Sequence, residues 1–234
     1  MLTVPATGST NADLLTLARD GAVEDGVWLR AEQQTAGRGR QGRAWQSPPG
    51  NLYASTVVRL LPHDPRAAGL ALVAAVALEE AVRGALPDAS NLQLKWPNDL
   101  LLGGAKLSGI LLERGGEHVV VGIGVNVAHH PELPDRPTTS LRAAGAAVDA
   151  AVFLDDLAQR FARWFETWRG QGIAPIAAQW GERAHPVGTT LSVRLPDGAA
   201  LAGRFAGLDA SGALLLDLAD GTRHVIHAGD VFLV

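Results

Sequence analysis

The sequence of 234 residues contains no cysteine. Without cysteine the chain can form no disulfide bond, no thiolate metal site and no cysteine nucleophile. The absence also fits a reducing compartment, so we expect a cytoplasmic protein. Any chemistry must therefore come from charged, amide, hydroxyl or imidazole side chains.

The chain also lacks a long hydrophobic run and a broadly basic character. Its longest apolar run, residues 67–78, is well short of the ~20 residues that span a bilayer, and the N-terminus lacks the pattern of a signal peptide. A formal net charge of −4 argues against a protein whose main role is to coat nucleic acid. The composition, 47% hydrophobic and 19% charged, is that of a globular protein with a sizeable core.

The most informative feature that is present is the segment Gly-Arg-Gly-Arg-Gln-Gly-Arg at residues 37–43. No Asp or Glu occurs between residues 33 and 50, although the chain as a whole is acidic. Glycine lets a backbone approach a ligand and adopt positive φ, and arginine binds phosphate or carboxylate oxygens in pairs. The segment predicts a loop that closes over an anion; considered alone, it also fits a solvated loop.

A second motif is Lys-Trp-Pro-Asn-Asp at residues 95–99. Proline forces a turn at the end of an expected strand, and the turn presents Asn98 and Asp99 together. Lys95 and Asp99 flank this turn and suit a phosphate and its magnesium ion respectively. An Asn-Asp pair after proline is also common in ordinary turns.

Two further segments contain candidate polar residues among apolar ones. Lys106 opens the segment AKLSGILLE at 105–113, where a lone lysine can also be a strand-end residue that reaches water. In VVVGIGVNV at 119–127, Gly122 and Gly124 remove bulk from a strand and favour close approach of a ligand. Asn126 shares the face of Gly124 and could read a nucleotide, or it could be a buried amide bonded to backbone.

The apolar patterns predict a mixed α+β domain. We expect a short helix after Ser9-Thr10-Asn11, strands at 27–32 and 52–60, and a long apolar helix at 65–86 whose wetter end carries Glu79, Glu80 and Arg83. Strands at 92–96, 105–112 and 118–127 are joined by short turns, which predicts an antiparallel meander. An amphipathic helix should follow at 155–168.

The C-terminal region has a different sequence pattern from the rest of the chain. From residue 185 the chain consists of short apolar runs separated by turn sequences such as Pro196-Asp197-Gly198 and Asp220-Gly221. Five brief strands at about ten-residue spacing predict a small β-barrel. We therefore expect two domains, residues 1–184 and residues 185–234.

Together these segments resemble the biotin protein ligases. The matching elements occur in that family's order: STN at 9–11, the glutamine at 34, GRGRQGRAW at 37–45, SPPGNLY at 47–53, KWPND at 95–99, AKLSGILLE at 105–113 and GIGVNV at 122–127. Several ordered motifs are far more specific than any one of them. The resemblance implies a mixed, largely antiparallel sheet flanked by helices, as in class II aminoacyl-tRNA synthetases, followed by an SH3-like β-barrel.

The resemblance also implies roles for individual residues. The biotin site would comprise Ser9, Thr10, Asn11, Gln34, Gly37, Arg38, Gly39, Arg40, Lys106 and Gly109. The nucleotide site would comprise Arg40, Arg43, Trp45, Lys95, Asn98 and Asn126. The catalytic residues would be Arg40, Lys106 and Asp99. Asp99 would either bind Mg²⁺ or orient and deprotonate the acceptor lysine.

The implied activity has two steps, with ATP and Mg²⁺ required. The family activates biotin to biotinyl-5′-AMP and transfers it to a lysine of the biotin carboxyl carrier protein of acetyl-CoA carboxylase. Some members carry an N-terminal DNA-binding repressor domain, for which the eight residues before Ser9 are too few. We therefore expect no DNA binding and no membrane association, and we slightly favour a homodimer.

Two other functions compete with this one. A lipoate or octanoate ligase or transferase shares the fold and the chemistry of acyl transfer to lysine, but the GRGRQGR and KWPND segments favour biotin. A nucleic-acid-binding module could use an Arg/Gly loop and a small barrel. Three arginines and a charge-balanced C-terminal region make that alternative the weaker one.

Overall fold

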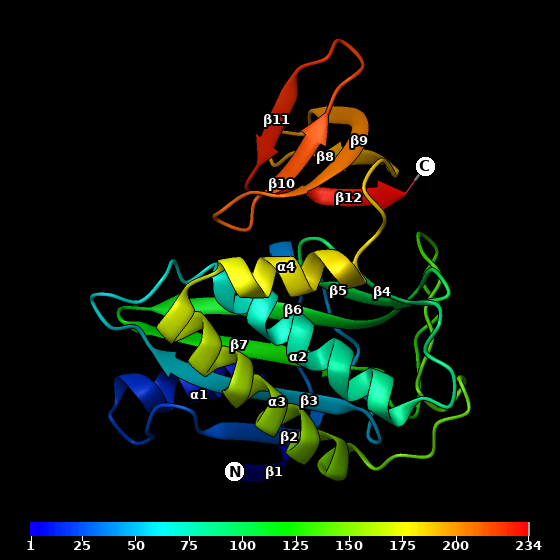
Figure 1. The fold of residues 1–234 in the computed structure, drawn as a ribbon. Helices are drawn as coiled ribbons and strands as arrows, with labels where there is room; N and C mark the ends of the chain where they lie inside the picture. Colours follow the sequence, from blue (N-terminus) through cyan, green and yellow to red (C-terminus); the bar gives the residue numbers. More distant parts are fainter. Residues whose placement is uncertain (234) are drawn as a thin grey trace.

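The computed structural model describes residues 1–233, which contain a seven-stranded sheet covered by helices and a separate five-stranded sheet (Figure 1). The larger sheet has the order β1-β2-β3-β7-β6-β5-β4, and every pair is antiparallel except β1 with β2. Its strands are β1 (Leu2–Thr7), β2 (Trp28–Gln34), β3 (Leu52–Arg59), β4 (Leu92–Lys95), β5 (Asp99–Leu102), β6 (Ala105–Gly115) and β7 (His118–Val125).

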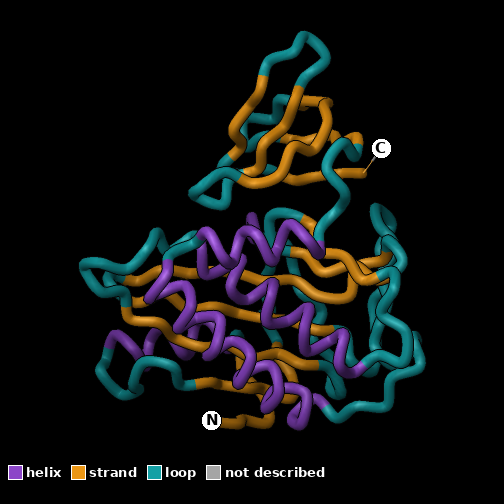
Figure 2. The backbone as a smooth tube through the Cα atoms, viewed as in Figure 1, coloured by secondary structure: helices purple, strands orange, loops and turns teal. Residues whose placement is uncertain are grey.

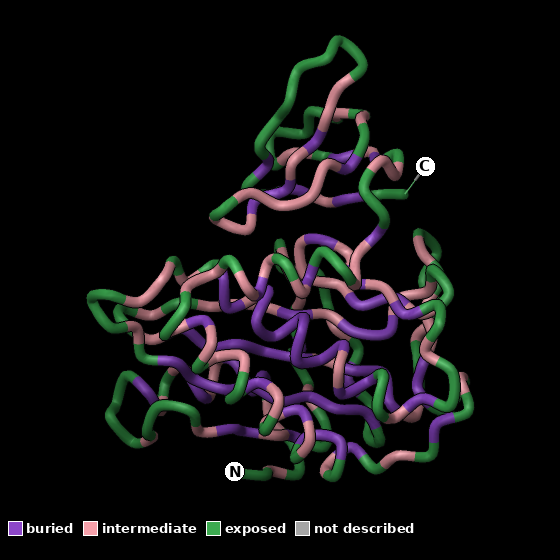
Figure 3. Tube along the Cα trace, viewed as in Figure 1, coloured by how far each residue is buried: buried purple, intermediate pink, exposed green. Residues whose placement is uncertain are grey.

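Helices cover both faces of this sheet, so its inner strands are buried on both sides (Figures 1 and 2). Helix α1 (Thr10–Arg19) packs on one face, and α2 (Gly69–Ala85), α3 (Ala150–Gln171) and α4 (Ala174–Arg183) form a layer on the other. In β3, Val58 joins the large core on the side of α2 and α3, whereas its neighbour Val57 joins the small core under α1. Two covered faces explain why β3 is buried without interruption from Leu52 to Val58, its polar Ser55 and Thr56 included (Figure 3).

The C-terminal sheet is wholly antiparallel and open. Its strands are β8 (Thr190–Arg194), β9 (Ala200–Leu208), β10 (Leu214–Asp217), β11 (Arg223–Ile226) and β12 (Asp230–Leu233), in the order β11-β10-β9-β8-β12. The five expected strands are present, but among residues 1–233 the short edge strands β11 and β12 do not pair, so the expected barrel is not closed. The sheet is consistent with an SH3-like domain. The division into residues 1–184 and 185–234 stays a prediction.

The structure confirms the expected meander and adds three elements. Strands β4 to β7 follow one another antiparallel, and Gly103 and Gly104 turn the chain between β5 and β6 at φ of 57° and 78°. Elements β1, β5 and α4 were not predicted from the sequence. Strand β1 is largely exposed and contains a proline, β5 has only four residues, and α4 has a proline in its first turn.

The long apolar helix differs from the prediction at both ends. Helix α2 begins at Gly69 rather than at residue 65, because residues 66–69 form a turn with i→i+3 backbone hydrogen bonds. Glu79 is fully buried instead of lying at a wet end. Its carboxylate pairs with Arg83 at 2.5 Å and with Arg183 of α4 at 2.8 Å. The unpredicted helix α4 covers this end of α2 and supplies the second arginine.

None of the helices in the described chain is long and apolar enough to cross a membrane.

Candidate active site

One cavity of about 400 Å³ lies where the two sheets meet. Its walls come from the start of α1, the loop before β3, the β4–β5 turn, strands β6 and β7, the segment 131–138 and strand β12. The structure brings nearly all the sequence-predicted site residues to this cavity: Ser9, Thr10, Asn11, Gln34, Arg38, Gly39, Arg40, Arg43, Trp45, Lys95, Asn98, Asp99, Lys106, Gly109 and Asn126. Gly37 is the exception.

Uncharged groups form what we call the neutral end: Thr10, Asn11 and the half-buried Gln34 line the cavity, and the buried Ser47 and Ser55 hydrogen-bond to them. Gln34 Oε1 accepts from the backbone N–H of Thr10 at 2.9 Å, and its Nε2 donates to Ser47 Oγ at 3.1 Å. Ser55 Oγ lies 2.7 Å from Thr10 Oγ1 and donates to Asn11 Oδ1 at 2.6 Å. Because these groups restrain one another, they present a fixed set of donors and acceptors. Ser47 and Ser55 were not predicted as site residues.

Two pairs of facing backbone positions form the floor of the cavity. Gly109 of β6 lies opposite Gly124 of β7, and Trp45 covers both: a Cβ at Gly124 would lie 2.6 Å from the indole ring. Two pairs further along the strands, where Gly122 faces Leu111, a Cβ at Gly122 would clash with Asn11 Oδ1. The expectation of a ligand against these glycines stays a prediction: all three line the cavity, and the side chains of Trp45 and Asn11 lie against them.

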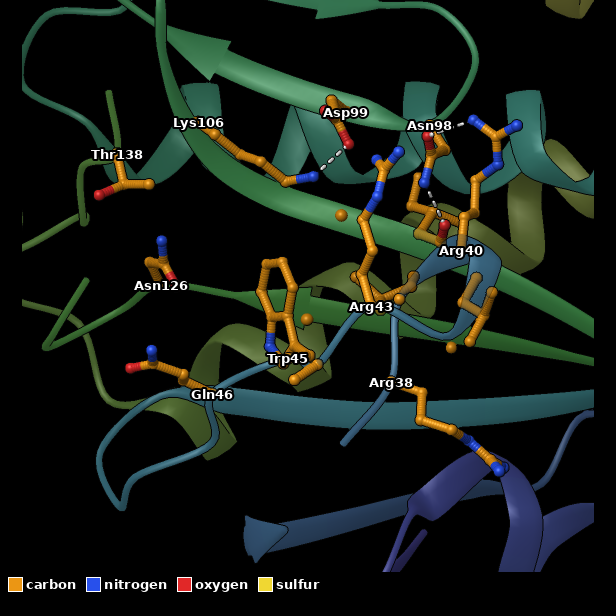
Figure 4. A pocket seen from close by; sticks show the side chains of 18 of the residues that line it. Arg38, Arg40, Arg43, Trp45, Gln46, Asn98, Asp99, Lys106, Asn126 and Thr138 are labelled. Atoms are coloured by element: carbon orange, nitrogen blue, oxygen red, sulfur yellow. Dashed lines mark hydrogen bonds and ion pairs between the residues drawn. The ribbon is translucent and has the colours of Figure 1, made fainter. Parts of the chain in front are cut away.

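Charged groups form what we call the charged end: Arg40, Lys95, Asp99, Lys106 and Asp230. Lys106 Nζ bonds Asp99 Oδ1 at 2.5 Å and lies 5.6 Å from the centroid of the Trp45 ring (Figure 4). Arg40 Nη1 donates to Asn98 Oδ1 at 3.4 Å. Burial lowers the pKa of Lys95, and the neighbouring charge of Lys106 lowers it further.

Strand β12 contributes a carboxylate that the sequence analysis did not identify. Asp230 forms ion pairs with Arg43 and, at 3.8 Å, with Arg40, whose Nη1 also donates to the carbonyl of Gly229 at 3.2 Å. Burial raises the pKa of Asp230, but the hydrogen bond and charge of Arg43 and the charge of Arg40 outweigh it and hold the pKa below its usual value. No local sequence signal indicated this contact, because 187 residues separate Arg43 from Asp230.

The Gly/Arg segment forms a compact loop rather than a string of ligand-binding glycines. The backbone N–H of Gly39 donates to the Arg43 carbonyl at 2.7 Å, and that of Trp45 donates to the Gly37 carbonyl at 2.9 Å. A single 3-10 turn, η1 (Arg40–Gly42), forms its tip. Of its glycines only Gly42 has positive φ, 72°.

Gly37 and Arg38 do not contribute to the charged end, in contrast to Arg40 and Arg43. A Cβ at Gly37 would lie 2.6 Å from Ser47 Oγ, so Gly37 packs beneath the loop instead of lining the cavity. Arg38 points away from Arg40 and Arg43 (Figure 4) and pairs with Glu113 at 3.5 Å. Of the three arginines of the segment, two therefore face the charged end.

Asn126 and Asn51 hold the chain that follows β7. Asn126 is buried and its Nδ2 donates to the Thr139 carbonyl at 3.0 Å, as the buried-amide alternative expected, although the residue also lines the cavity. Asn51 Oδ1 accepts the backbone N–H groups of residues 127, 128 and 129 at 2.9–3.0 Å. Asn51 was not predicted as a site residue; it anchors the chain just before the lining segment 131–138.

The described residues show no protein cage for a metal ion. No group of three or more His, Asp or Glu residues within 1–233 could hold one. The carboxylate of Asp99, the predicted magnesium ligand, is already paired with Lys106. Magnesium often uses one or two carboxylates together with substrate phosphates, so the residues present fit a magnesium ion that arrives with a nucleotide rather than one held by the protein alone.

Comparison with known proteins gives consistent matches. Residues 5–126 match the family described as "Biotin/lipoate A/B protein ligase family", and residues 192–234 match "Biotin protein ligase C terminal domain". The chain is 43% identical to a biotin–[acetyl-CoA-carboxylase] ligase of Paracoccus denitrificans, covering 97% of each sequence. It is 41% identical to the ligase of the same name from Mycobacterium tuberculosis, covering 97% of this chain and 86% of the relative.

A solved structure is also similar. The biotin protein ligase of Aquifex aeolicus, in complex with biotin and ATP, superposes with a TM-score of 0.85 at 26% sequence identity. The match covers 100% of this chain and 97% of the other.

Proposed function

This chain belongs to the biotin/lipoate A/B protein ligase family, and we propose that it is an ATP-dependent biotin–[acetyl-CoA-carboxylase] ligase. It activates biotin to biotinyl-5′-AMP and then transfers biotin to a lysine of the biotin carboxyl carrier protein. The named relatives and the Aquifex aeolicus complex with biotin and ATP support this activity.

The observation that carries the proposal is the pairing of two unlike environments in one cavity. The neutral end offers fixed amide and hydroxyl groups, which suit the uncharged ring of biotin. The charged end offers Arg40, Lys95 and Lys106, which suit the carboxylate of biotin and the phosphates of ATP. Trp45 lies between the two ends, over the glycine floor.

In the first step an oxygen of the biotin carboxylate attacks the α-phosphorus of ATP. The bond from that phosphorus to the bridging oxygen breaks, and pyrophosphate leaves with the electron pair. Both reactants are anions, so fixed cations are needed to reduce their repulsion and to stabilise the charge that builds on phosphorus. We assign this role to Arg40 and Lys106, with Arg43, Lys95 and Asn98 around the nucleotide.

In the second step the neutral amine of the acceptor lysine attacks the acyl carbon and AMP leaves. Asp99 is the candidate to orient this amine and to take its proton, once the charge of Lys106 is engaged by the substrate. Water would destroy the mixed anhydride between the two steps, so the Gly/Arg loop over the cavity must exclude it. A magnesium ion bound with ATP, beside the carboxylate of Asp99, would supply positive charge to the pyrophosphate leaving group.

The test is an assay of both half-reactions. Purified protein with ATP and biotin should release pyrophosphate and form an adenylate that hydroxylamine traps, and it should label one lysine of a carrier protein. Lipoate in place of biotin provides the control for the lipoate ligase alternative. Release that depends on lipoate and not on biotin would contradict the proposal. The expectations of a homodimer and of no DNA binding stay predictions.

A further inference from the structure

The segment 131–138 forms one wall of the main cavity of about 400 Å³, and none of its residues has a role in the mechanism so far. Its tip is a tight turn, in which Leu133 and Arg136 form an isolated antiparallel bridge. Directly after the turn the chain runs beside the start of β6, where the backbone N–H of Lys106 donates to the Pro137 carbonyl at 2.9 Å. The turn is therefore attached to the strand that carries Lys106.

Arg136 is the cation of this turn. Its side chain is 28% exposed, and the residue lines the main cavity as Lys95 and Lys106 do. The same three residues also line a smaller cavity of about 170 Å³ that adjoins the main one, whereas Arg40 and Arg43 do not. The charged end therefore extends past the Gly/Arg loop into a space lined by two lysines and Arg136.

The protein partner of Arg136 is its neighbour in the chain. The guanidinium binds the carboxylate of Asp135 through Nε at 3.0 Å and Nη2 at 2.5 Å, and that carboxylate side chain is 57% exposed. Ion pairs this exposed contribute little, because water competes for both groups. Lys106, in contrast, is paired with a carboxylate that is only 10% exposed. Arg136 can therefore exchange Asp135 for a substrate anion more easily than Lys106 can leave Asp99.

The charges around Arg136 show that it belongs to the charged end. The hydrogen bond with Asp135 raises the pKa of Arg136, and the charges of Asp99 and Asp230 raise it further. Burial lowers the pKa of Lys95, and the charges of Lys106 and Arg136 lower it further. The two lysines and Arg136 thus repel one another, and a polyanion between them would relieve that repulsion.

Resting on the proposed function, we propose that Arg136 binds the β- and γ-phosphates of ATP and, with Lys95, holds the pyrophosphate as it leaves. The bond from the biotin carboxylate oxygen to the α-phosphorus forms as the bond from that phosphorus to the bridging oxygen breaks. The bridging oxygen keeps the electron pair, so negative charge builds on pyrophosphate. A guanidinium can bind two of its oxygens at once. Arg40 then serves the α-phosphate, which stays in the adenylate.

A contact with the adenylate itself is the competing role for Arg136. The two roles differ in the half-reaction that they serve. A guanidinium on the α-phosphate would act in adenylate formation and again when AMP leaves. A guanidinium on the pyrophosphate would act in adenylate formation alone. The smaller cavity favours the second role, because Arg136 lines it and Arg40 does not.

The experiment uses the full chain and compares three variants. Arg136→Gln removes the charge, and Arg136→Lys keeps the charge but loses the paired donors. Arg142→Gln is the matched control, because Arg142 is an exposed arginine that follows the same segment and lines neither cavity. Each variant is assayed for biotin-dependent pyrophosphate release, for inhibition of that release by added pyrophosphate, and for transfer of biotin from synthetic biotinyl-5′-AMP to the carrier protein.

Arg136→Gln should raise the KM for ATP and the inhibition constant for pyrophosphate about tenfold or more, the scale of losing one charge-assisted contact. Arg136→Lys should recover part of this loss, because it keeps the charge. Transfer from biotinyl-5′-AMP should stay within about twofold of the unmodified protein in both variants, as should every activity of Arg142→Gln.

Two results would overturn the role of Arg136 alone. The first is a normal KM for ATP and a normal inhibition constant for pyrophosphate in Arg136→Gln. The second is a loss of transfer from biotinyl-5′-AMP as large as the loss of adenylate formation, which would assign Arg136 to the adenylate or to the fold. Failure of the unmodified protein to form adenylate would instead overturn the proposed function.

Discussion

The two ends of the main cavity are built from opposite kinds of interaction. At the neutral end, Gln34, Thr10 and Ser55 bond one another through groups that need no exchange of partners when a ligand arrives. At the charged end, Lys106 is paired with Asp99, and Arg40 with Asp230. Those cations must leave a protein carboxylate to meet a substrate anion. The neutral end is therefore ready in advance, whereas the charged end must rearrange.

The largest expected effect comes from removing one cation at the charged end. Lys106→Ala or Arg40→Ala should keep the fold and slow adenylate formation at least ~100-fold, the scale of losing one preorganised charge donor. Biotin-dependent pyrophosphate release measures the rate, and thermal unfolding checks the fold. Arg114→Ala is the control, because Arg114 is an exposed arginine of β6 that bonds the Gly116 carbonyl. Normal turnover by either cation variant would mean that the site is misassigned.

A methyl group on the glycine floor should damage the neutral end selectively. Gly122→Ala places a Cβ against the amide of Asn11, and such overpacking costs about 1–3 kcal/mol of unfolding free energy. The KM for biotin should rise more than the KM for ATP, because Asn11 belongs to the neutral end. Gly84→Ala in α2 is the control, since its Cβ would meet only a flexible arginine at 3.6 Å. Equal increases in both KM values would contradict the division of the cavity.

Removal of an anchor behind the lining segment tests the charged end indirectly. Asn51→Ala leaves three backbone N–H groups, that of Val127 buried, without their acceptor, which should cost about 2–3 kcal/mol of unfolding free energy. Urea unfolding measures the loss. The exposed Asn91, replaced by alanine, provides the comparison. If Asn51→Ala loses no more unfolding free energy than Asn91→Ala, water replaces the Asn51 side chain as acceptor at little cost.

The smallest expected effect concerns Asp230 and pH. Its pKa is lowered in the folded protein, so its pairing stabilises the fold above the usual carboxyl pKa and is lost as pH falls through the lowered value. Asp230→Asn should lower the Tm at neutral pH by about 1–2 °C, the scale of one partly buried ion pair. The difference between the two proteins should vanish once the pH falls below the lowered pKa of Asp230. A difference in Tm that persists there would show that charge is not what holds Asp230 in place.

Much of the charged and neutral ends could be predicted from the sequence because the residues lie in short motifs at the ends of strands. One turn contains Lys95, Asn98 and Asp99, and a short hairpin pairs β6 with β7. Turn and strand signals in the local sequence are therefore enough to predict that these residues lie close together. The resemblance to a family then joined the motifs into one site. The five short C-terminal strands were likewise visible from their turns.

What the sequence did not reveal are contacts between residues far apart in the chain. Asp230 meets Arg43 across 187 positions, and Arg183 neutralises the buried Glu79 from a helix that was not predicted. The contact of Trp45 with Gly124 is another example. A glycine in the sequence indicates that a side chain is absent, but it does not indicate which residue packs there. Such contacts depend on tertiary packing, which cannot be predicted from local propensity.

The indole of Trp45 limits the depth of the main cavity at the glycine floor. It lies across two backbone positions that have no side chains, on the paired strands β6 and β7. Exchanging it for a smaller side chain would deepen the cavity by roughly the size of an aromatic ring while leaving every charged residue in place. An enzyme altered in this way could be matched with an enlarged vitamin analogue that the natural protein would reject, which would give a labelling pair built around a single residue.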